Sequence, residues 1–327
     1  MGRPAALCAI ACLLACSRDP EPTPKQRARE KPAPAATVAA PRVKVPLKTP
    51  LRERLVAIGD VHGDLDATRI ALRLAGALDE KDHWSGGKMV VVQTGDQLDR
   101  GDDERRIVDL LTTLSAEAKA AGGALHVLNG NHETMNVAGD FRYVTPAGFT
   151  SFLDFAKDAD RPELARFSPI ERGRAAAFLP GGPYALKMAD RSTILIAGDT
   201  VFVHGGVAPE HVRYGVERIN REVTQFMRGE IRQLPPFLQR DDSPMWLRGY
   251  SDEPLAPAAC ARLEQVLSEL GVRRMVVGHT VQRRGITSAC GERVWRIDVG
   301  LARHYGGPRQ VLEIHEGKVR VVGSPVP

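Results

Sequence analysis

The sequence predicts an α/β protein, and three observations lead to that prediction. Short apolar runs typical of buried strands alternate with segments whose apolar residues recur at helical spacing. This alternation indicates βαβ units and a largely parallel first sheet. Farther along the chain, short apolar runs follow one another closely, which favours a second sheet rich in antiparallel strands. Finally, five predicted strands end in loops that carry Asp, Asn or His beside Gly.

The first 50 residues differ from the rest in composition. They contain nine Lys or Arg against three Asp or Glu, a net charge of +6, whereas the whole chain carries +5. The remainder is thus close to neutral, and it gives no compositional reason to expect a nucleic-acid partner. Residues 17–50 are rich in Pro, Ala and basic side chains. Such a segment cannot bury enough apolar surface to fold, so we expect a disordered tether.

An apolar run from Ala5 to Ala15 follows Arg3 and has the length of a signal-peptide core. It is too short to span a bilayer. It ends in Leu-Leu-Ala-Cys at Cys16, which resembles the lipobox at which bacterial lipoproteins are cleaved and acylated. The sequence thus predicts a lipoprotein signal peptide over residues 1–16, with lipidation of Cys16. This resemblance implies export and anchoring on the periplasmic side of a membrane, the outer membrane in a Gram-negative cell. An ordinary secretory signal cleaved nearby is the alternative.

Three strands separated by helices open the remaining chain. The predicted helices cover 67–78 and 107–118. The strands and the polar residues that follow them are Leu55–Ile58 with Asp60 and His62, Met89–Val92 with Asp96, and Leu125–Leu128 with Asn131 and His132. Because open α/β sheets bind ligands outside the carboxyl ends of their strands, we expect these side chains to face one site.

The rest of the chain gives a less regular pattern. Residues 140–180 are expected to form helices and loops. Further strands are predicted at 184–188, 193–197, 201–203, which ends at His204, and 275–277, which ends before His279. Helices are predicted at 217–230 and 258–270, and hairpins between 286 and 322.

Cys260 and Cys290 are the cysteines that remain after Cys16. In an exported protein the two could form a disulfide. Cys260 also shares a helix face with leucines at 263, 267 and 270, which is equally consistent with a buried, inert thiol. Both possibilities stay open at this point.

Five loops in a fixed order now form a pattern: 59–63, 95–101, 130–133, 204–206 and 278–280. This order resembles the phosphoprotein-phosphatase branch of the calcineurin-like metallophosphoesterases. Segments 129–136, 246–250 and 295–300 are similar to those of the Shewanella-like protein phosphatases. The resemblance implies that residues 51–327 are a metallophosphatase catalytic domain. Its fold would be two mixed β-sheets packed as a sandwich with flanking helices.

The resemblance also assigns a role to each loop residue. It implies two divalent metal ions, Mn, Fe or Zn, because these ligand types accept all three. The implied metal ligands, with Asp96 bridging, are Asp60, His62, Asp96, Asn131, His204 and His279. His132 would be the general acid and Asp99 the carboxylate that orients it. Arg100 and Arg248, together with Asn131, would bind the phosphate.

The implied activity is hydrolysis of a phosphoprotein by a hydroxide that bridges the metals. Phosphotyrosine and phosphoserine or phosphothreonine are both open, because the Ser-Ala-Pro-Asn-Tyr signature of the eukaryotic serine/threonine enzymes is missing. One alternative is hydrolysis of dinucleotide polyphosphates or other small phosphoesters at the same site. A second is a non-catalytic binding lipoprotein, which we would expect to have lost His132 or Asp99. The expected partners are a phosphorylated substrate and, through the lipid, a membrane; the sequence gives no oligomeric state.

Overall fold

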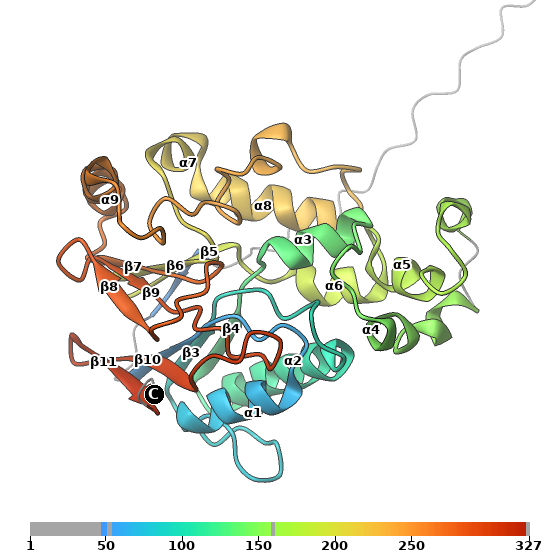
Figure 1. The fold of residues 1–327 in the computed structure, drawn as a ribbon, viewed down its shortest axis with the longest axis horizontal. Helices are drawn as coiled ribbons and strands as arrows, with labels where there is room; N and C mark the ends of the chain where they lie inside the picture. Colours follow the sequence, from blue (N-terminus) through green and yellow to red (C-terminus); the bar gives the residue numbers. More distant parts are fainter. Residues whose placement is uncertain (1–46, 51–53, 158–160, 325–327) are drawn as a thin grey trace, which may run out of the picture. The chain divides into compact units, whose positions relative to one another are not determined.

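Two mixed β-sheets face each other in the computed structural model, which describes residues 47–50, 54–157 and 161–324 (Figure 1). All of these belong to one unit, residues 43–327. The predicted signal peptide with Cys16 and nearly all of the predicted tether lie outside the described residues. Helices cover the outer faces of both sheets, so the predicted sandwich with flanking helices is confirmed.

The first sheet has the order β11-β10-β2-β3-β4. Its strands are β2 (Arg54–Ile58), β3 (Val90–Gln93), β4 (Ala124–Val127), β10 (Gln310–His315) and β11 (Lys318–Gly323). The three predicted strands β2, β3 and β4 are parallel, as expected. The hairpin β10–β11 adds to the sheet antiparallel to β2, and makes the sheet mixed.

The second sheet has the order β1-β5-β6-β7-β9-β8. Its strands are β1 (Lys48–Thr49), β5 (Ile194–Ala197), β6 (Thr200–Val203), β7 (Arg274–Val277), β8 (Thr287–Ala289) and β9 (Val294–Arg296). The antiparallel-rich prediction is wrong, because β6, β7 and β9 run parallel and only β5–β6 and β8–β9 are antiparallel. A long connection separates β6 from β7, and β7 then pairs with β6 in parallel. Local sequence patterns cannot reveal this pairing.

Two further predictions need correction. The segment 184–188 is not a strand but helix α6 (Pro183–Ala189). Pro183 occupies a first-turn position that suits proline, and a five-residue apolar run does not distinguish a buried helix from a strand. The predicted tether 17–50 is also too long, because Lys48 and Thr49 form β1 and pair with β5. The edge of β5 offers unpaired backbone groups, so even a polar segment can add to it.

Alternating side chains along β2 show how the core is divided. Leu55 and Ala57 point into the space between the sheets, whereas Val56 and Ile58 point outward to helices α1 (Leu65–Leu74) and α2 (Glu104–Ala120). On the outer face of the second sheet lie α6, α8 (Val216–Met227) and α9 (Pro257–Leu270). The remaining α-helices are α3 (Asn131–Ala138), α4 (Pro146–Thr150), α5 (Arg172–Phe178) and α7 (Pro209–Tyr214), with 3-10 turns at Leu153–Ala156, Pro162–Arg166 and Pro236–Leu238.

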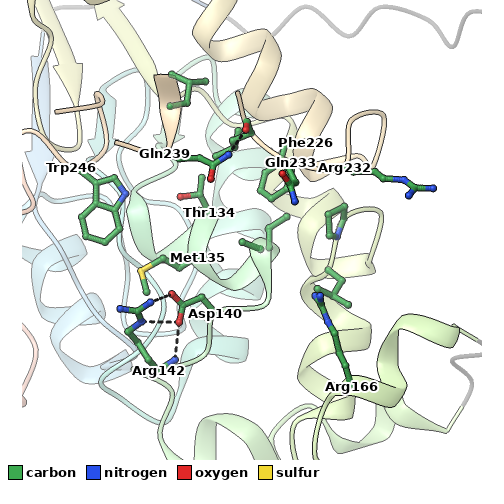
Figure 2. A pocket seen from close by; sticks show the side chains of 16 residues that line it. Thr134, Met135, Asp140, Arg142, Arg166, Phe226, Arg232, Gln233, Gln239 and Trp246 are labelled. Carbon is green, nitrogen blue, oxygen red and sulfur yellow. Dashed lines mark hydrogen bonds and ion pairs between the residues drawn. The ribbon is translucent and has the colours of Figure 1, made fainter. Parts of the chain in front are cut away.

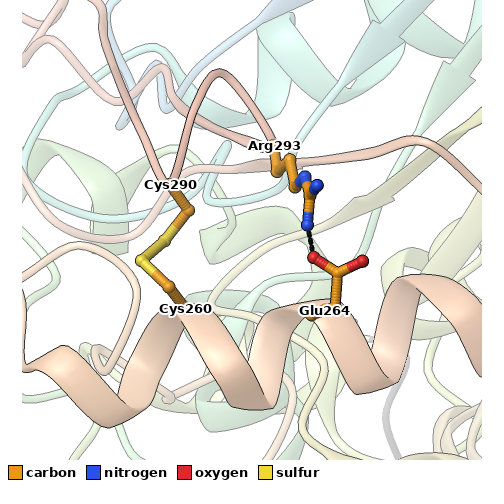
Figure 3. The surroundings of a disulfide bond; sticks show 4 residues. All are labelled: Cys260, Glu264, Cys290 and Arg293. Atoms are coloured by element: carbon orange, nitrogen blue, oxygen red, sulfur yellow. Dashed lines mark ion pairs between the residues drawn. A yellow bond between two sulfur atoms is a disulfide. The ribbon is translucent and has the colours of Figure 1, made fainter.

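Cys260 and Cys290 form a disulfide, which decides between the two possibilities left open above. It joins α9 to the turn between β8 and β9, and Glu264 of α9 pairs with Arg293 beside it (Figure 3). Among the described residues, no helix combines the length and the apolar character needed to cross a membrane.

Candidate metal centre

The carboxyl ends of parallel strands from both sheets meet at one place. β2, β3 and β4 of the first sheet lead to Asp60, His62, Asp96 and Asn131, and β6 and β7 of the second lead to His204 and His279. The structure thus brings together all six residues predicted to bind metal, and all six are buried. The site depends on the sandwich, because neither sheet supplies all of these side chains.

Asp96 lies at the centre of this cluster. Its Oδ2 atom is 3.1 Å from His204 Nε2 and 3.7 Å from His62 Nε2. His204 Nε2 is also 2.9 Å from Asn131 Oδ1 and 3.1 Å from His279 Nδ1. Two groups of potential metal-binding atoms, each within 4.8 Å of one another, share Asp96: one with His62 and His132, the other with His204 and His279. A shared carboxylate is what a bridging ligand requires.

Asp60 belongs to the same cluster. Its Oδ2 atom is 3.9 Å from His62 Nε2 and accepts a hydrogen bond from the backbone N–H of His279 at 3.1 Å. Gly278 allows this approach, because a Cβ there would be 2.4 Å from Asp60 Oδ1. Gly130 is constrained in the same way, since its Cβ would be 2.3 Å from Asp96 Oδ1.

The protonation states fit bound cations. Burial raises the pKa of Asp60, and the carboxylates of Asp298 and Asp96 raise it further. Burial lowers the pKa of His62 to about 4, and burial together with His204 lowers that of His279 to about 2. Neutral imidazoles can bind metals. Among the described residues, buried Asp60 Oδ1 and His279 Nε2 have no hydrogen-bond partner. Crowded carboxylates, neutral imidazoles and unpartnered buried atoms together fit divalent cations.

His132 differs from these histidines. Its Nδ1 is 2.5 Å from Asp99 Oδ2, which leaves Nε2 facing the cluster, 3.7 Å from Asp96 Oδ2. Burial alone would lower the pKa of His132, but Asp96 and Asp99 outweigh it and raise the pKa to about 9. A protonated imidazole held in one orientation is suited to proton donation.

Both arginines predicted to bind phosphate lie beside the cluster. The Arg100 guanidinium stacks on the ring of Tyr143 at 4.0 Å, and that ring lies 5.2 Å from the ring of His132. Arg248 donates to the backbone oxygen of His279 at 3.2 Å and to Thr280 Oγ1 at 2.9 Å. Each arginine is thus placed next to a member of the predicted site.

The backbone around the centre is unusual. Five non-glycine residues of these loops have positive φ angles, between 39° and 68°: His62, Asp96, Asp99, Arg100 and His279. Non-glycine residues rarely adopt positive φ angles, and such backbone conformations concentrate at functional sites. Glu133 supports the turn at Asp96, because its carboxylate accepts hydrogen bonds from the backbone N–H groups of Asp96, Gln97 and Gly130.

Sequence reasoning missed a buried network behind His132. Arg174 of α5 is fully buried, donates to Asn136 Oδ1 at 2.8 Å and lies 3.3 Å from Asp99 Oδ1. It also pairs with Glu104. Arg174 lies in the segment with the weakest pattern, far from any recognised loop, so the sequence carried no signal for it. Asp298 was missed too, although it lies in the segment 295–300 that supports the resemblance; burial raises its pKa to about 6.

Comparisons with known proteins agree with this geometry. Residues 53–283 match the family described as calcineurin-like phosphoesterases. The chain is 42% identical to Shewanella-like protein phosphatase 2 of Arabidopsis thaliana over 305 residues, which cover 83% of this chain and 78% of that protein. It is 28% identical to Shewanella-like protein phosphatase 1 of Plasmodium berghei, over 82% and 74% of the two chains.

A solved structure shows the same fold. The cold-active protein-tyrosine phosphatase of a psychrophilic Shewanella species superposes with a TM-score of 0.68 at 24% identity, over 86% of this chain and 82% of that one. Calcineurin-like phosphoesterases use two divalent metals, and the two side-chain groups that share Asp96 can hold such ions. The family match and the 42% identical relative place this chain among the calcineurin-like phosphoesterases, in the group of Shewanella-like protein phosphatases.

Proposed function

We propose that this chain hydrolyses phosphorylated tyrosine, serine or threonine side chains of proteins, as a metal-dependent phosphomonoesterase. The observation that supports this most directly is the pairing of His132 with Asp99 beside the cluster around Asp96. A phosphomonoester with a poor leaving group needs a proton donor, and this pair holds one in place. The names of the relatives point to the same substrate class.

The residues of the site have two binding roles, one toward the metals and one toward the phosphate. Asp60, His62, Asp96, Asn131, His204 and His279 would hold the two metals. Bound divalent cations would supply positive charge for the phosphate oxygens and activate water as a nucleophile. Arg100 and Arg248 would bind the phosphate oxygens, for which a guanidinium provides paired donors.

His132 would donate the proton that the leaving group needs. As water forms a new P–O bond and the ester P–O bond breaks, Nε2 of His132 would give its proton to the departing oxygen. Asp99 holds Nδ1 and supports the imidazolium before transfer. Asn136 and Arg174 donate hydrogen bonds to Asp99 Oδ1 at 3.1 and 3.3 Å and hold this carboxylate in position.

An activity panel tests the proposal. We expect the purified protein with added Mn²⁺ to hydrolyse an aryl phosphate, and a chelator to abolish this activity. A phosphotyrosine peptide, a phosphoserine peptide and diadenosine tetraphosphate should be compared under Mn²⁺, Fe²⁺ and Zn²⁺. Activity that survives exhaustive chelation would contradict a metal-dependent mechanism. If only the dinucleotide is hydrolysed, the substrate is a small phosphoester and not a phosphorylated protein.

We also propose that the protein is an exported lipoprotein, anchored at the periplasmic side of a membrane. The apolar run 5–15 and the cysteine that ends it support this proposal. Cys16→Ser should move the protein from the membrane to the soluble fraction and abolish incorporation of labelled fatty acid. Cys12→Ser, within the same apolar run, is the matched control and should leave both unchanged. Membrane sedimentation of the Cys16→Ser protein would disprove lipid anchoring through this residue.

A further inference from the structure

A pocket of about 540 Å³ is lined by side chains that include Met135 and Trp246 (Figure 2). Its walls come from α3 and the turn after it, from Arg166 and the segment 179–180, from the end of α8 and from residues between 232 and 246. Phe226, Leu234 and Leu238 supply an apolar, buried part of the lining. The volume lies in the range of ligand-binding pockets. No step of the proposed mechanism uses this pocket.

The pocket adjoins the predicted catalytic residues. Met135 lines it, and its sulfur is 3.7 Å from Nδ2 of Asn131. Trp246 lines it as well, with its ring 5.7 Å from that of His279. Helix α3 therefore carries Asn131 and His132 at its beginning and forms a pocket wall along its length. A substrate whose phosphate reached the centre would extend along this wall.

The charged residues of the lining give the pocket a positive character. Of its three arginines, Arg142 pairs with Asp140 at 2.6 Å, and Asp140 is the one carboxylate of the lining. Arg166 and Arg232 are exposed and form no ion pair within the part of the chain that the structure describes. Figure 2 shows Arg166 and Arg232 on the side of the pocket away from Trp246. Both guanidinium groups lack an ion-pair partner among the described residues, although Glu163 is within electrostatic range of Arg166. Beside an apolar lining they favour an anionic, partly apolar ligand.

We propose that this pocket binds an acidic side chain of the polypeptide that carries the phosphorylated residue. The proposal rests on the phosphatase function proposed above. From Asn131 to Ala138, α3 rises by about 10 Å, and an extended peptide covers that distance in about three residues. Arg166 reaches the end of this helix, because its Nη2 would lie 3.2 Å from a Cβ on Gly139. The preferred acidic residue thus lies about two to four positions from the phosphorylated one. Arg166 and Arg232 select it, and the apolar lining accommodates the chain beside it.

Peptide kinetics test this. Two phosphotyrosine peptides would be compared, one with Glu at the second to fourth positions on both sides and one with Ala there. The wild-type protein should show a lower KM for the acidic peptide, and added salt should reduce the difference. In the double variant Arg166→Glu/Arg232→Glu, KM for the acidic peptide should rise by about tenfold or more, since each exposed charge contact contributes up to about fivefold and the reversal adds repulsion. Its kcat should change little.

Two controls separate the possible failures. Arg213→Glu reverses an exposed charge outside the pocket lining and should leave the peptide preference unchanged. Turnover of an aryl phosphate, which has no flanking residues, should be the same in all variants. If the wild-type protein hydrolyses the aryl phosphate but does not distinguish the peptides, the pocket proposal is overturned while the phosphatase function stands. If no phosphomonoester is hydrolysed, the phosphatase function itself fails.

Discussion

At the residue scale, the buried histidines of the site show how neighbours set the role of one side-chain type. Burial lowers the pKa of His62 to about 4 and that of His279 to about 2. His132 is as deeply placed, yet Asp96 and Asp99 raise its pKa to about 9 against the effect of burial. A neutral imidazole suits metal binding and a protonated one suits proton donation. Asp96 also raises the pKa of His62 and His279, so the carboxylate that distinguishes the acid from the ligands is Asp99 on Nδ1 of His132.

His132→Ala tests the acid role. The variant should lose about 10²–10⁴-fold in kcat on phenyl phosphate, whose leaving group needs a proton, and far less on dinitrophenyl phosphate. Asp99→Asn should show the same pattern with a smaller loss. The measurement is kcat across aryl phosphates that differ in leaving-group pKa. His83→Ala, a largely exposed histidine, is the matched control. An equal loss on all substrates would remove His132 from proton donation.

At the scale of elements, α5 positions the pair of His132 and Asp99 from behind. Arg174 enters a space with no solvent access and touches Asp99, Asn136 and Glu104. Its guanidinium lies against the oxygen of Asp99 that His132 leaves free, Oδ1. A helix outside both sheets therefore keeps the proton donor in place.

Arg174→Met should damage both stability and turnover. Removing the guanidinium leaves buried carboxylates without their partner, which costs about 3–5 kcal/mol in the free energy of unfolding. In the double variant Arg174→Met/Glu104→Gln the unpaired charge of Glu104 is removed as well. Most of the lost free energy of unfolding should therefore be recovered. Turnover on phenyl phosphate should stay low, because Asp99 still lacks its support. Urea unfolding and kcat measure the two effects. Recovery of full activity in the double variant would show that Arg174 serves stability alone.

The same elements show what sequence reasoning can reach. The strand ends at Asp60, Asp96 and Asn131 were predictable because apolar runs and polar loop residues are local patterns. The helix α6 was not, because Pro183 and a short apolar run fit two structures. The pairing of β1 with β5 and the contact of Arg174 with Asp99 join residues far apart in the chain. Such contacts depend on the folded arrangement and leave no local pattern.

At the scale of the whole described unit, the metal centre joins the two sheets. Asp60, His62, Asp96 and Asn131 follow strands of the first sheet, whereas His204 and His279 follow strands of the second. The cluster also concentrates buried carboxylates, since Asp60, Asp96 and Asp298 are close enough to influence one another's ionisation. Without cations this arrangement opposes folding, and with them it connects the halves of the sandwich.

Metal should therefore stabilise the fold as well as serve catalysis. At a free Mn²⁺ concentration of about 100 times the dissociation constant, binding adds about 2.7 kcal/mol to the stability. For a domain of this size that raises the unfolding midpoint by about 5 °C. His279→Ala, from the second sheet, and Asp60→Asn, from the first, should each reduce the shift, and His83→Ala should retain it. Calorimetry with Mn²⁺ and with a chelator measures the difference.

Asp60→Asn gives this prediction a second, independent measurement. In the presence of chelator the variant should be at least as stable as the wild-type protein, because the substitution removes a buried charge whose Oδ1 has no hydrogen-bond partner among the described residues. With Mn²⁺ the order should reverse, since the wild-type carboxylate then gains a cation. A variant that is less stable under chelator and still shows the full metal shift would assign Asp60 to structure alone. Reversal of the order would show that the charges which oppose folding are those that bind the metal.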